Sequence, residues 1–276
     1  MYHQQAGFKR VIVRLWLSIW TAIAIVMMSA IAQPLVAQQD SNPLLPLQLP
    51  NAAPHPLPSS LDTWVDLHNV GDYFDNITPF GFGYLVWSRF PVQVYLDSGE
   101  LEPGTVPSVE QTQNWHQAMS SAVQEWNQFI PLEISDRPDH ADIIVLAQTP
   151  PLRWPTSSLQ EGSDVPSQPS PLVIPRAQTA ETTYNIALAE TNDQMVMKQQ
   201  YTIQLAPNQS LEYLEATARH ELGHALGIWG HSPVQEDVLY FSQVQTPPSI
   251  SARDINTLKK IYQQPTQLGW PLIGAE

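Results

Sequence analysis

The sequence of 276 residues contains no cysteine. This absence excludes a disulfide framework, a zinc site built from thiolates and a cysteine nucleophile. Basic residues are also scarce, because 12 lysines and arginines stand against 26 acidic residues and leave a formal net charge of -14. The chain therefore lacks the basic surface of a nucleic-acid-binding protein, and we expect no nucleic-acid partner. We interpret its acidity as a contribution to solubility rather than as an acidic binding surface.

The N-terminus has the three parts of an export signal. Basic residues precede an uncharged, mostly apolar run over residues 15–32, which ends on the small residues Ala30 and Ala32. This order predicts a secretory signal peptide over residues 1–32. The run is nearly long enough to span a bilayer, so an uncleaved membrane anchor stays open as an alternative. Both alternatives place the rest of the chain outside the cytoplasm, as a secreted, periplasmic or anchored protein.

Composition divides the remainder of the chain. Residues 33–60 are rich in proline and carry almost no charge, which predicts a weakly structured linker, with a removable pro-segment as the functional alternative. From residue 61 to 276 the composition is globular and predicts one large domain. Within it, residues 148–178 are rich in proline, serine and glutamine, so we expect a surface insertion there.

The globular part predicts an α+β fold. Apolar spacings of three and four from Trp115 to Ile130 predict a helix that Pro131 ends. Ser210 and Gly227 are placed to begin and end a second helix, and Ser251 and Asp254 are spaced like the capping box of a third. Short apolar or alternating runs predict strands at 91–97, 141–147, 182–190 and 195–205, the last two joined by a polar turn.

The stretch "HELGHALGIWGH" concentrates metal-ligand residues in the second predicted helix. His220 and His224 are four residues apart, so their imidazoles project from the same side of the helix. Gly227 can turn the chain sharply and bring His231 back as a third ligand. Three protein ligands leave one position of a tetrahedral zinc site open, which is typical of a catalytic rather than a structural ion.

Glu221 lies beside the first of these ligands. A carboxylate in this place can take a proton from a water that zinc activates, and can pass that proton to the leaving amine. A histidine pair on a helix is more often packed or exposed than bound to metal. The full pattern, however, fixes five residues, three of them the uncommon histidine, and seldom arises by chance. We therefore predict one catalytic zinc held by His220, His224 and His231, with Glu221 as general base.

The same stretch resembles the zinc signature of the metzincin metalloproteases. Ser232, directly after the third histidine, is similar to the matrixin branch, and "SARDINTLKKIYQQP" resembles the matrixin C-terminal helix. The resemblance extends from about Phe90 to Pro265, and the signal-like start with its proline-rich spacer suggests a bacterial exported member. It implies a zinc endopeptidase with a mixed twisted sheet, a long back helix, an active-site helix and a small C-terminal subdomain that ends in a helix.

The resemblance also implies how substrate binds. The hairpin at 183–205 would supply an edge strand, along which an extended peptide or protein segment pairs as an added strand. Residues 241–250 would form a wall of the pocket that receives the residue after the scissile bond. We expect a monomer, with membrane contact only through the possible N-terminal anchor.

Three departures from the family pattern bear on these expectations. Leu239 stands where metzincins place a methionine beneath the zinc, and leucine is close to it in volume. No histidine lies between Ala141 and Arg219, so we predict that the matrixins' structural zinc is absent; a matrixin-type calcium site has little support. A cysteine latency switch is excluded. A non-catalytic zinc module that binds peptides is an alternative function, supported only by Leu239, and hydrolysis of small peptides or other amides is also open.

Overall fold

The computed structural model describes residues 48–97, 108–152 and 178–274. The expected signal or anchor segment, the first part of the expected linker and most of the expected insertion lie outside these residues. None of the helices described is both long and apolar enough to cross a membrane. In chain order the elements are α1 (Ser59–Asp62), η1 (Phe74–Asn76), β1 (Val92–Asp97), α2 (Val109–Trp126), β2 (Leu132–Ser135), η2 (Pro138–His140), β3 (Ile143–Leu146), β4 (Ala180–Thr191), β5 (Gln194–Leu205), α3 (Leu211–Ala225) and α4 (Ala252–Tyr262).

The strands form one mixed five-stranded sheet in the order β2-β1-β3-β5-β4. The pairs β1–β2, β1–β3 and β3–β5 are parallel, whereas β4 runs antiparallel to β5 and forms one edge. Asn192 and Asp193 take positive φ angles of 49° and 60° in the turn between β4 and β5, as a tight hairpin requires. The α+β class, the mixed sheet and the edge hairpin are thus confirmed. The short strand β2 was not predicted.

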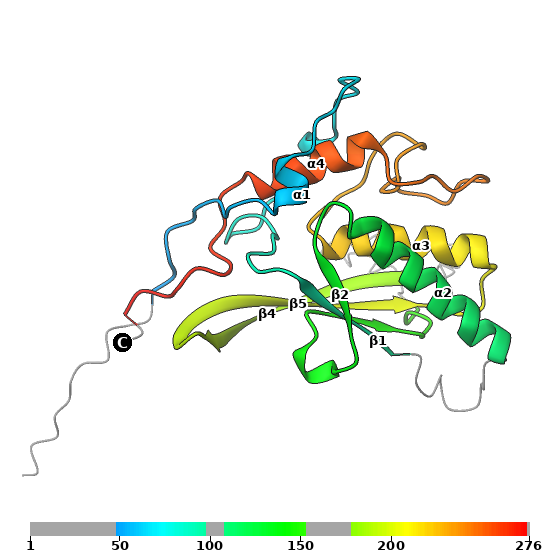
Figure 1. Ribbon diagram of the computed structural model, residues 1–276, viewed down its shortest axis with the longest axis horizontal. Helices are drawn as coiled ribbons and strands as arrows, with labels where there is room; N and C mark the ends of the chain where they lie inside the picture. Colours follow the sequence, from blue (N-terminus) through cyan, green and yellow to red (C-terminus); the bar gives the residue numbers. More distant parts are fainter. Residues whose placement is uncertain (1–47, 98–107, 153–177, 275–276) are drawn as a thin grey trace, which may run out of the picture. The chain divides into compact units, whose positions relative to one another are not determined.

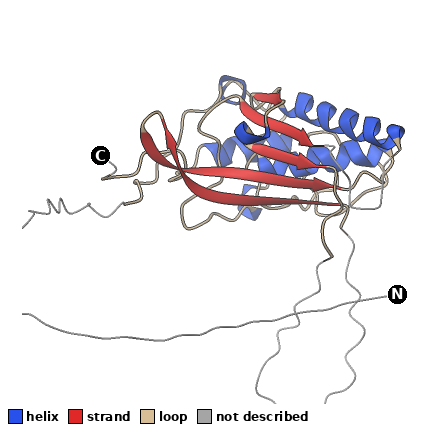
Figure 2. Cartoon of the chain, turned by 90° about the horizontal axis from the view of Figure 1, so that it is seen from below, coloured by secondary structure: helices blue, strands red, loops and turns tan. Residues whose placement is uncertain are grey.

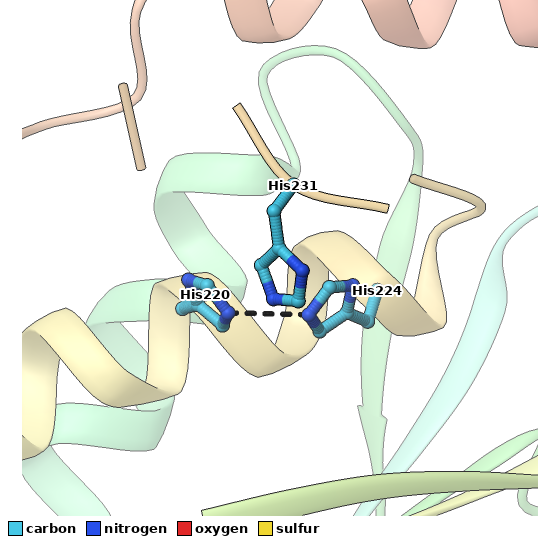
Figure 3. Close-up of side chains that lie close together, drawn as sticks. All are labelled: His220, His224 and His231. Atoms are coloured by element: carbon cyan, nitrogen blue, oxygen red, sulfur yellow. Dashed lines mark hydrogen bonds between the residues drawn. The ribbon is translucent and has the colours of Figure 1, made fainter. Parts of the chain in front are cut away.

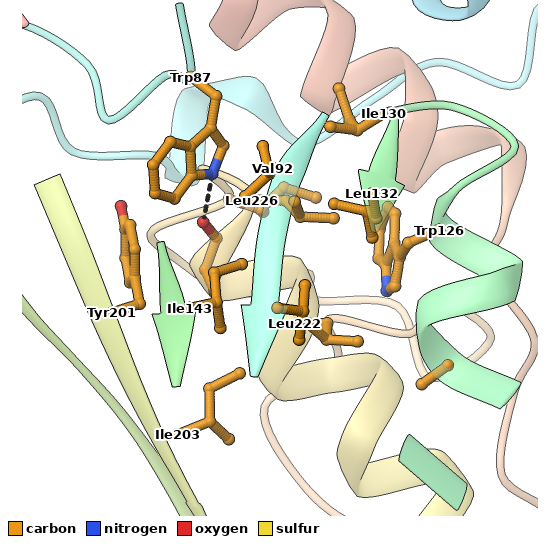
Figure 4. Close-up of a cluster of buried hydrophobic side chains, with 14 of the residues drawn as sticks. Trp87, Val92, Trp126, Ile130, Leu132, Ile143, Tyr201, Ile203, Leu222 and Leu226 are labelled. Atoms are coloured by element: carbon orange, nitrogen blue, oxygen red, sulfur yellow. Dashed lines mark hydrogen bonds between the residues drawn. The ribbon is translucent and has the colours of Figure 1, made fainter. Parts of the chain in front are cut away.

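Helices α2 and α3 lie side by side on one face of the sheet (Figures 1 and 2). The predicted apolar stripe of α2 is buried in the core, and Trp115 and Trp126 are fully inaccessible. Figure 4 shows Trp126 beside Leu132 of β2. The helix ends at Trp126 rather than at Ile130. The side-chain oxygen of Asn127 accepts the Leu132 amide at 2.7 Å, which stabilises the turn that leads into β2.

Three helix ends lie where the sequence places them, although one cap lacks its side-chain hydrogen bond. Ser251 and Asp254 form the predicted capping box at the start of α4, with each side chain accepting the other residue's amide. Ser210 takes the N-cap position of α3 as predicted, although its side chain makes no capping hydrogen bond. Gly227, with φ of 120°, follows α3 as predicted.

Residues 48–60 differ from the weakly structured linker expected there. The amide and carbonyl of Ala53 both bond to Thr266 at 3.1 Å, and Gln48 pairs in the same way with Ile273. His55 stacks on Trp270 with ring centroids 4.2 Å apart. A proline has no amide hydrogen to donate, but the residues between the prolines can still form main-chain hydrogen bonds. A proline-rich composition is therefore compatible with an ordered, extended segment.

Helix α4 is not the last part of the described residues. After α4, residues 263–274 return to the sheet, where the amides of Gly269 and Leu272 donate to Met197 and Met195 of β5 at 2.9 and 2.8 Å. Strand β3 pairs only with residues 201–204 of β5, and the returning segment pairs with β5 near Val196 instead. Residues 48–53 in turn pair with this returning segment. The expected helical C-terminus is therefore corrected to a helix followed by an extended return.

We expect a chain that begins at Ser59 to be less stable than one that begins at Leu44. The shorter chain loses the main-chain bonds of Gln48 and Ala53 and exposes Trp270 to solvent. A loss of about 3 kcal/mol would lower the melting temperature by roughly 6–12 °C in a domain of this size. Thermal unfolding of the two chains, followed by circular dichroism, measures the difference. Equal melting temperatures would show that the residues before Ser59 do not contribute to stability.

Candidate metal centre

Helix α3 carries two of the three predicted ligands on the face that looks away from the core. His220 and His224 lie one turn apart, and their Nε2 atoms are 3.1 Å from each other (Figure 3). Neighbouring elements hold the helix on both sides of this pair. The indole of Trp126 on α2 donates to the carbonyl of Arg219 at 2.9 Å, and Trp87 donates to the carbonyl of Ala225 at 3.0 Å.

The third ligand arrives through two tight glycine turns. A Cβ on Gly227 would lie 2.4 Å from the carbonyl oxygen of Leu85, and one on Gly230 would lie 2.4 Å from that of Asn76. Both positions therefore need glycine, because the backbone approaches another segment closely there. The sequence predicts this turn only for Gly227. Beyond them His231 turns back over α3, and the candidate ligand atoms of the three histidines all lie within 4.8 Å of one another (Figure 3).

Backbone carbonyls fix the tautomers of the two helical histidines. The Nδ1 of His220 lies 2.8 Å from the carbonyl oxygen of Val238, and the Nδ1 of His224 lies 2.7 Å from that of Ile228. A carbonyl can only accept, so each Nδ1 carries the proton and each neutral ring leaves a lone pair on Nε2. This arrangement of a bonded Nδ1 and a free Nε2 is the usual support for histidine ligands of zinc.

The spacing of these lone pairs fits a bound ion. With one proton on each Nδ1, neither neutral ring has a hydrogen to place between the facing Nε2 atoms, so their 3.1 Å contact is repulsive without a cation. Two nitrogens bound to one tetrahedral zinc at ~2.0–2.1 Å are separated by about 3.3 Å. The donor set, its tautomers and its spacing therefore match zinc, and they bring together all three ligands that the sequence predicted.

Burial lowers the pKa of His224 and His231 and so favours the neutral form of these two rings, which is the form that binds metal. Burial, and then the proximity of His220 and His231, lower the pKa of His224 well below its ordinary value. Burial is also the main cause that lowers the pKa of His231, followed by His220. Neutral imidazoles need not lose a proton before they coordinate a cation, so the site is ready for metal near neutral pH.

Glu221 lies next to the ligand cluster without belonging to it. Its side chain is 8% exposed, and one carboxylate oxygen accepts a hydrogen bond of 2.6 Å from the hydroxyl of Thr182 on β4. Burial raises the pKa of Glu221, while His220 and the hydrogen bond from Thr182 act in the opposite direction. The position of Glu221 beside the ligand cluster is compatible with a general base, and that role stays a prediction. The hydrogen bond from Thr182 could not be predicted, because a threonine in a strand gives no sequence signal.

A buried aspartate supports the loop that contacts His220. Asp254 is fully buried and accepts hydrogen bonds from the Val238 amide at 3.0 Å and from the Tyr73 hydroxyl at 2.6 Å. The same Val238 peptide segment offers the carbonyl that orients His220. Sequence reasoning assigned Asp254 only to a capping box, so its second role under the candidate metal centre was missed.

Leu239 and Ser232 complete this support. Leu239 is fully buried and packs on Gly223, where an added Cβ would lie 2.6 Å from a leucine methyl. Its carbonyl accepts the Ser232 amide at 2.8 Å, and the Ser232 hydroxyl donates to Asp237. Asp237 also pairs with Arg253 at 3.0 Å. Leu239 thus packs against the turn of α3 that carries His220 and His224, and Ser232 bonds the end of the His231 turn to residues 237–239.

A cavity opens beside His220 and Glu221. It contains about 690 Å³ of empty space, counting the part that is open to solvent. One wall consists of residues from 241–250, as expected, and the other comes from α3 and the start of β4. The lining residues that matter here are Thr179, Ala180, Ala216, Thr217, Phe241, Val244, Pro247 and Pro248. The predicted pocket wall is therefore in place, while its use by a substrate stays a prediction.

Comparison with known proteins does not identify a family for this site. No family model matches the chain, and no curated protein matches it. Among the residues that the structure describes, the three histidines are the one group of three or more histidines and acidic residues arranged to hold a metal ion. The predicted absence of a second zinc stays a prediction.

Proposed function

We propose that the chain is an exported zinc endopeptidase of the metzincin type. The observation that supports this most directly is the pair of Nδ1-protonated histidines whose Nε2 atoms face each other at 3.1 Å, with His231 above them. When both rings are neutral, such a pair is repulsive unless a cation, either a metal ion or a proton, lies between the nitrogens. A carboxylate beside the open side of the cluster and a sheet edge next to it add the parts that peptide hydrolysis needs.

Zinc held by His220, His224 and His231 would supply Lewis acidity, which lowers the pKa of water and polarises a carbonyl. The chain's own residues do the rest. Glu221 accepts one proton from the attacking water, whose oxygen forms a bond to the carbonyl carbon of the substrate. When the carbon–nitrogen bond breaks, Glu221 returns that proton to the leaving amine. Burial raises the pKa of this carboxylate, which favours its role as a proton carrier.

Among the described residues no strand pairs with the outer edge of β4, so its outward main-chain groups could pair with a substrate. The amide of Tyr201 on β5 donates to the carbonyl of Asp142 on the β3 side, whereas the amide of Ala206 donates to the carbonyl of Thr179 on the β4 side. Successive residues of β5 therefore bond alternately to the two neighbouring strands. Tyr184 and Thr182 are the partners of Tyr201 and Ile203 in the register. Their own main-chain groups therefore point away from β5, towards the space beside the candidate metal centre. An extended peptide can pair there as an added strand, with one side chain in the cavity.

A non-catalytic zinc module that binds peptides is the second candidate. Its only support is Leu239 in place of a methionine. Because Leu239 fills its place against Gly223 and leaves the loop bonds intact, we favour the enzyme. Retention of Glu221 also favours it, since a zinc that serves shape alone needs no carboxylate there. Hydrolysis of small peptides or other amides would appear as activity on short substrates only.

The test is cleavage of an unfolded protein by the exported chain. We expect zinc-loaded protein to cut it, a chelator to stop cleavage, and added zinc to restore it, because the three histidines are the predicted ligands. Mass spectrometry of the fragments identifies the cut bonds, and metal analysis of the same sample reports the bound ion. A folded protein that binds zinc stoichiometrically yet cuts neither proteins nor peptides would reject the enzyme in favour of the binding module.

A further inference from the structure

We propose that Thr182 is a positioning residue that holds Glu221 in place from the substrate-binding edge of the sheet. The inference rests on the proposed function. Its basis is a single contact between two elements far apart in sequence: the Thr182 hydroxyl on β4 lies 2.6 Å from a carboxylate oxygen of Glu221 on α3. The same hydroxyl oxygen is 3.2 Å from the main-chain carbonyl of Glu221, so the side chain is seated against the helix at this residue.

The contact restricts the carboxylate of Glu221, on which the main-chain amide of Thr182 also acts. A glutamate has three side-chain torsions, and among the described residues Thr182 makes the one side-chain hydrogen bond to this carboxylate. Glu221 is buried, so a missing donor would not be replaced freely by bulk water. The bond uses one oxygen of the carboxylate. The other oxygen then keeps a defined position from which it can accept the proton of the attacking water.

Thr182 also belongs to the edge that would bind the substrate. Its side chain faces α3, whereas its main-chain amide and carbonyl point away from β5. A peptide that pairs with the edge of β4 would therefore bond to the main chain of the residue whose hydroxyl holds the base. Thr182 fixes the distance between the peptide backbone and Glu221, which a base on the helix alone would not do.

Replacement by valine separates this role from a general structural one. Thr182→Val keeps the β-branched shape that suits a strand and removes only the hydroxyl. We expect kcat to fall about 10- to 100-fold, the range for loss of one hydrogen bond to a charged group. KM should change little, because the outward main-chain groups remain. Zinc affinity, measured by titration of the metal-free protein, should stay the same, and Thr182→Ser should restore most of kcat.

The matched control is Thr183→Val on the same strand. Thr183 is exposed, and its hydroxyl donates to the Thr202 carbonyl on β5 rather than to α3. The same chemical change one residue away should therefore leave kcat within about twofold of the unmodified protein. A fall in kcat in both variants, or a rise in KM without a fall in kcat in Thr182→Val, would overturn the positioning role.

A stability cycle tests the contact without any activity. Thermal unfolding is compared for the unmodified protein, Thr182→Val, Glu221→Ala and the double variant, all free of metal. We expect Thr182→Val to lower the melting temperature by about 2–6 °C in the unmodified chain and much less beside Glu221→Ala. Equal shifts in both backgrounds overturn the inference. If the folded, zinc-loaded protein cleaves nothing, the proposed function fails and the positioning role falls with it, while coupling in the cycle would still identify a structural contact.

Discussion

Replacement of Glu221 by glutamine should lower kcat by about 10²–10⁴-fold and leave the zinc in place. This is the range that a positioned general base contributes. Glutamine has nearly the same shape but cannot accept and return a proton. Its amide oxygen can still accept the Thr182 hydroxyl, so the geometry around the metal ligands is preserved. Steady-state kinetics on a peptide substrate measures the loss, and metal analysis of the purified variant verifies that one zinc remains per chain.

The fold should survive this substitution. Burial raises the pKa of Glu221, which means that the buried, charged carboxylate is a cost to the folded metal-free protein. Neutral glutamine removes that cost, so the metal-free variant should melt no lower than the unmodified chain at pH 7. Glu212→Gln, an exposed change on the same helix, is the control and should keep full activity. Undiminished cleavage in Glu221→Gln would assign the proton transfer to another group.

The ligands could be predicted because local geometry determines most of their placement. The spacing of His220 and His224 follows from helical periodicity alone, and Gly227 marks the turn that returns His231. None of these inferences needs a contact between distant parts of the chain. The same is true of the hairpin β4–β5, where alternation and a polar turn specify both strands and their register.

The supporting residues could not be predicted because they act across the fold. Thr182 is separated from Glu221 by 39 residues and Tyr73 from Asp254 by 181, and neither pair has a sequence pattern. Residues 48–60 were misassigned for a related reason: composition describes a segment's own preferences, while its order comes from pairing with 266–273. Strand β2 has only four residues with one of them buried, too short for a periodic signal.

Loss of His224 should abolish tight zinc binding. His224→Ala removes one of two ligands that share a helix face and also frees the Ile228 carbonyl. Loss of an outer hydrogen-bond partner alone weakens metal binding about 10–100-fold, so loss of a ligand should exceed this range. In the unmodified protein, zinc at ~1,000 times its dissociation constant adds about 4 kcal/mol of stability. For a domain of this size that raises the melting temperature by roughly 8–16 °C.

The variant should show almost no such rise, and this contrast is more informative than its melting temperature in the absence of metal. His224 is half-buried and bonds to the Ile228 carbonyl, so its removal costs packing and one hydrogen bond and lowers stability with or without zinc. Only the zinc-induced shift isolates the ligand role. His68 is exposed and distant in sequence from the three histidines, so His68→Ala should keep the full zinc-induced rise in melting temperature. A full zinc-induced shift in His224→Ala would mean that zinc binds elsewhere, and the facing imidazoles would then need another partner to offset their repulsion.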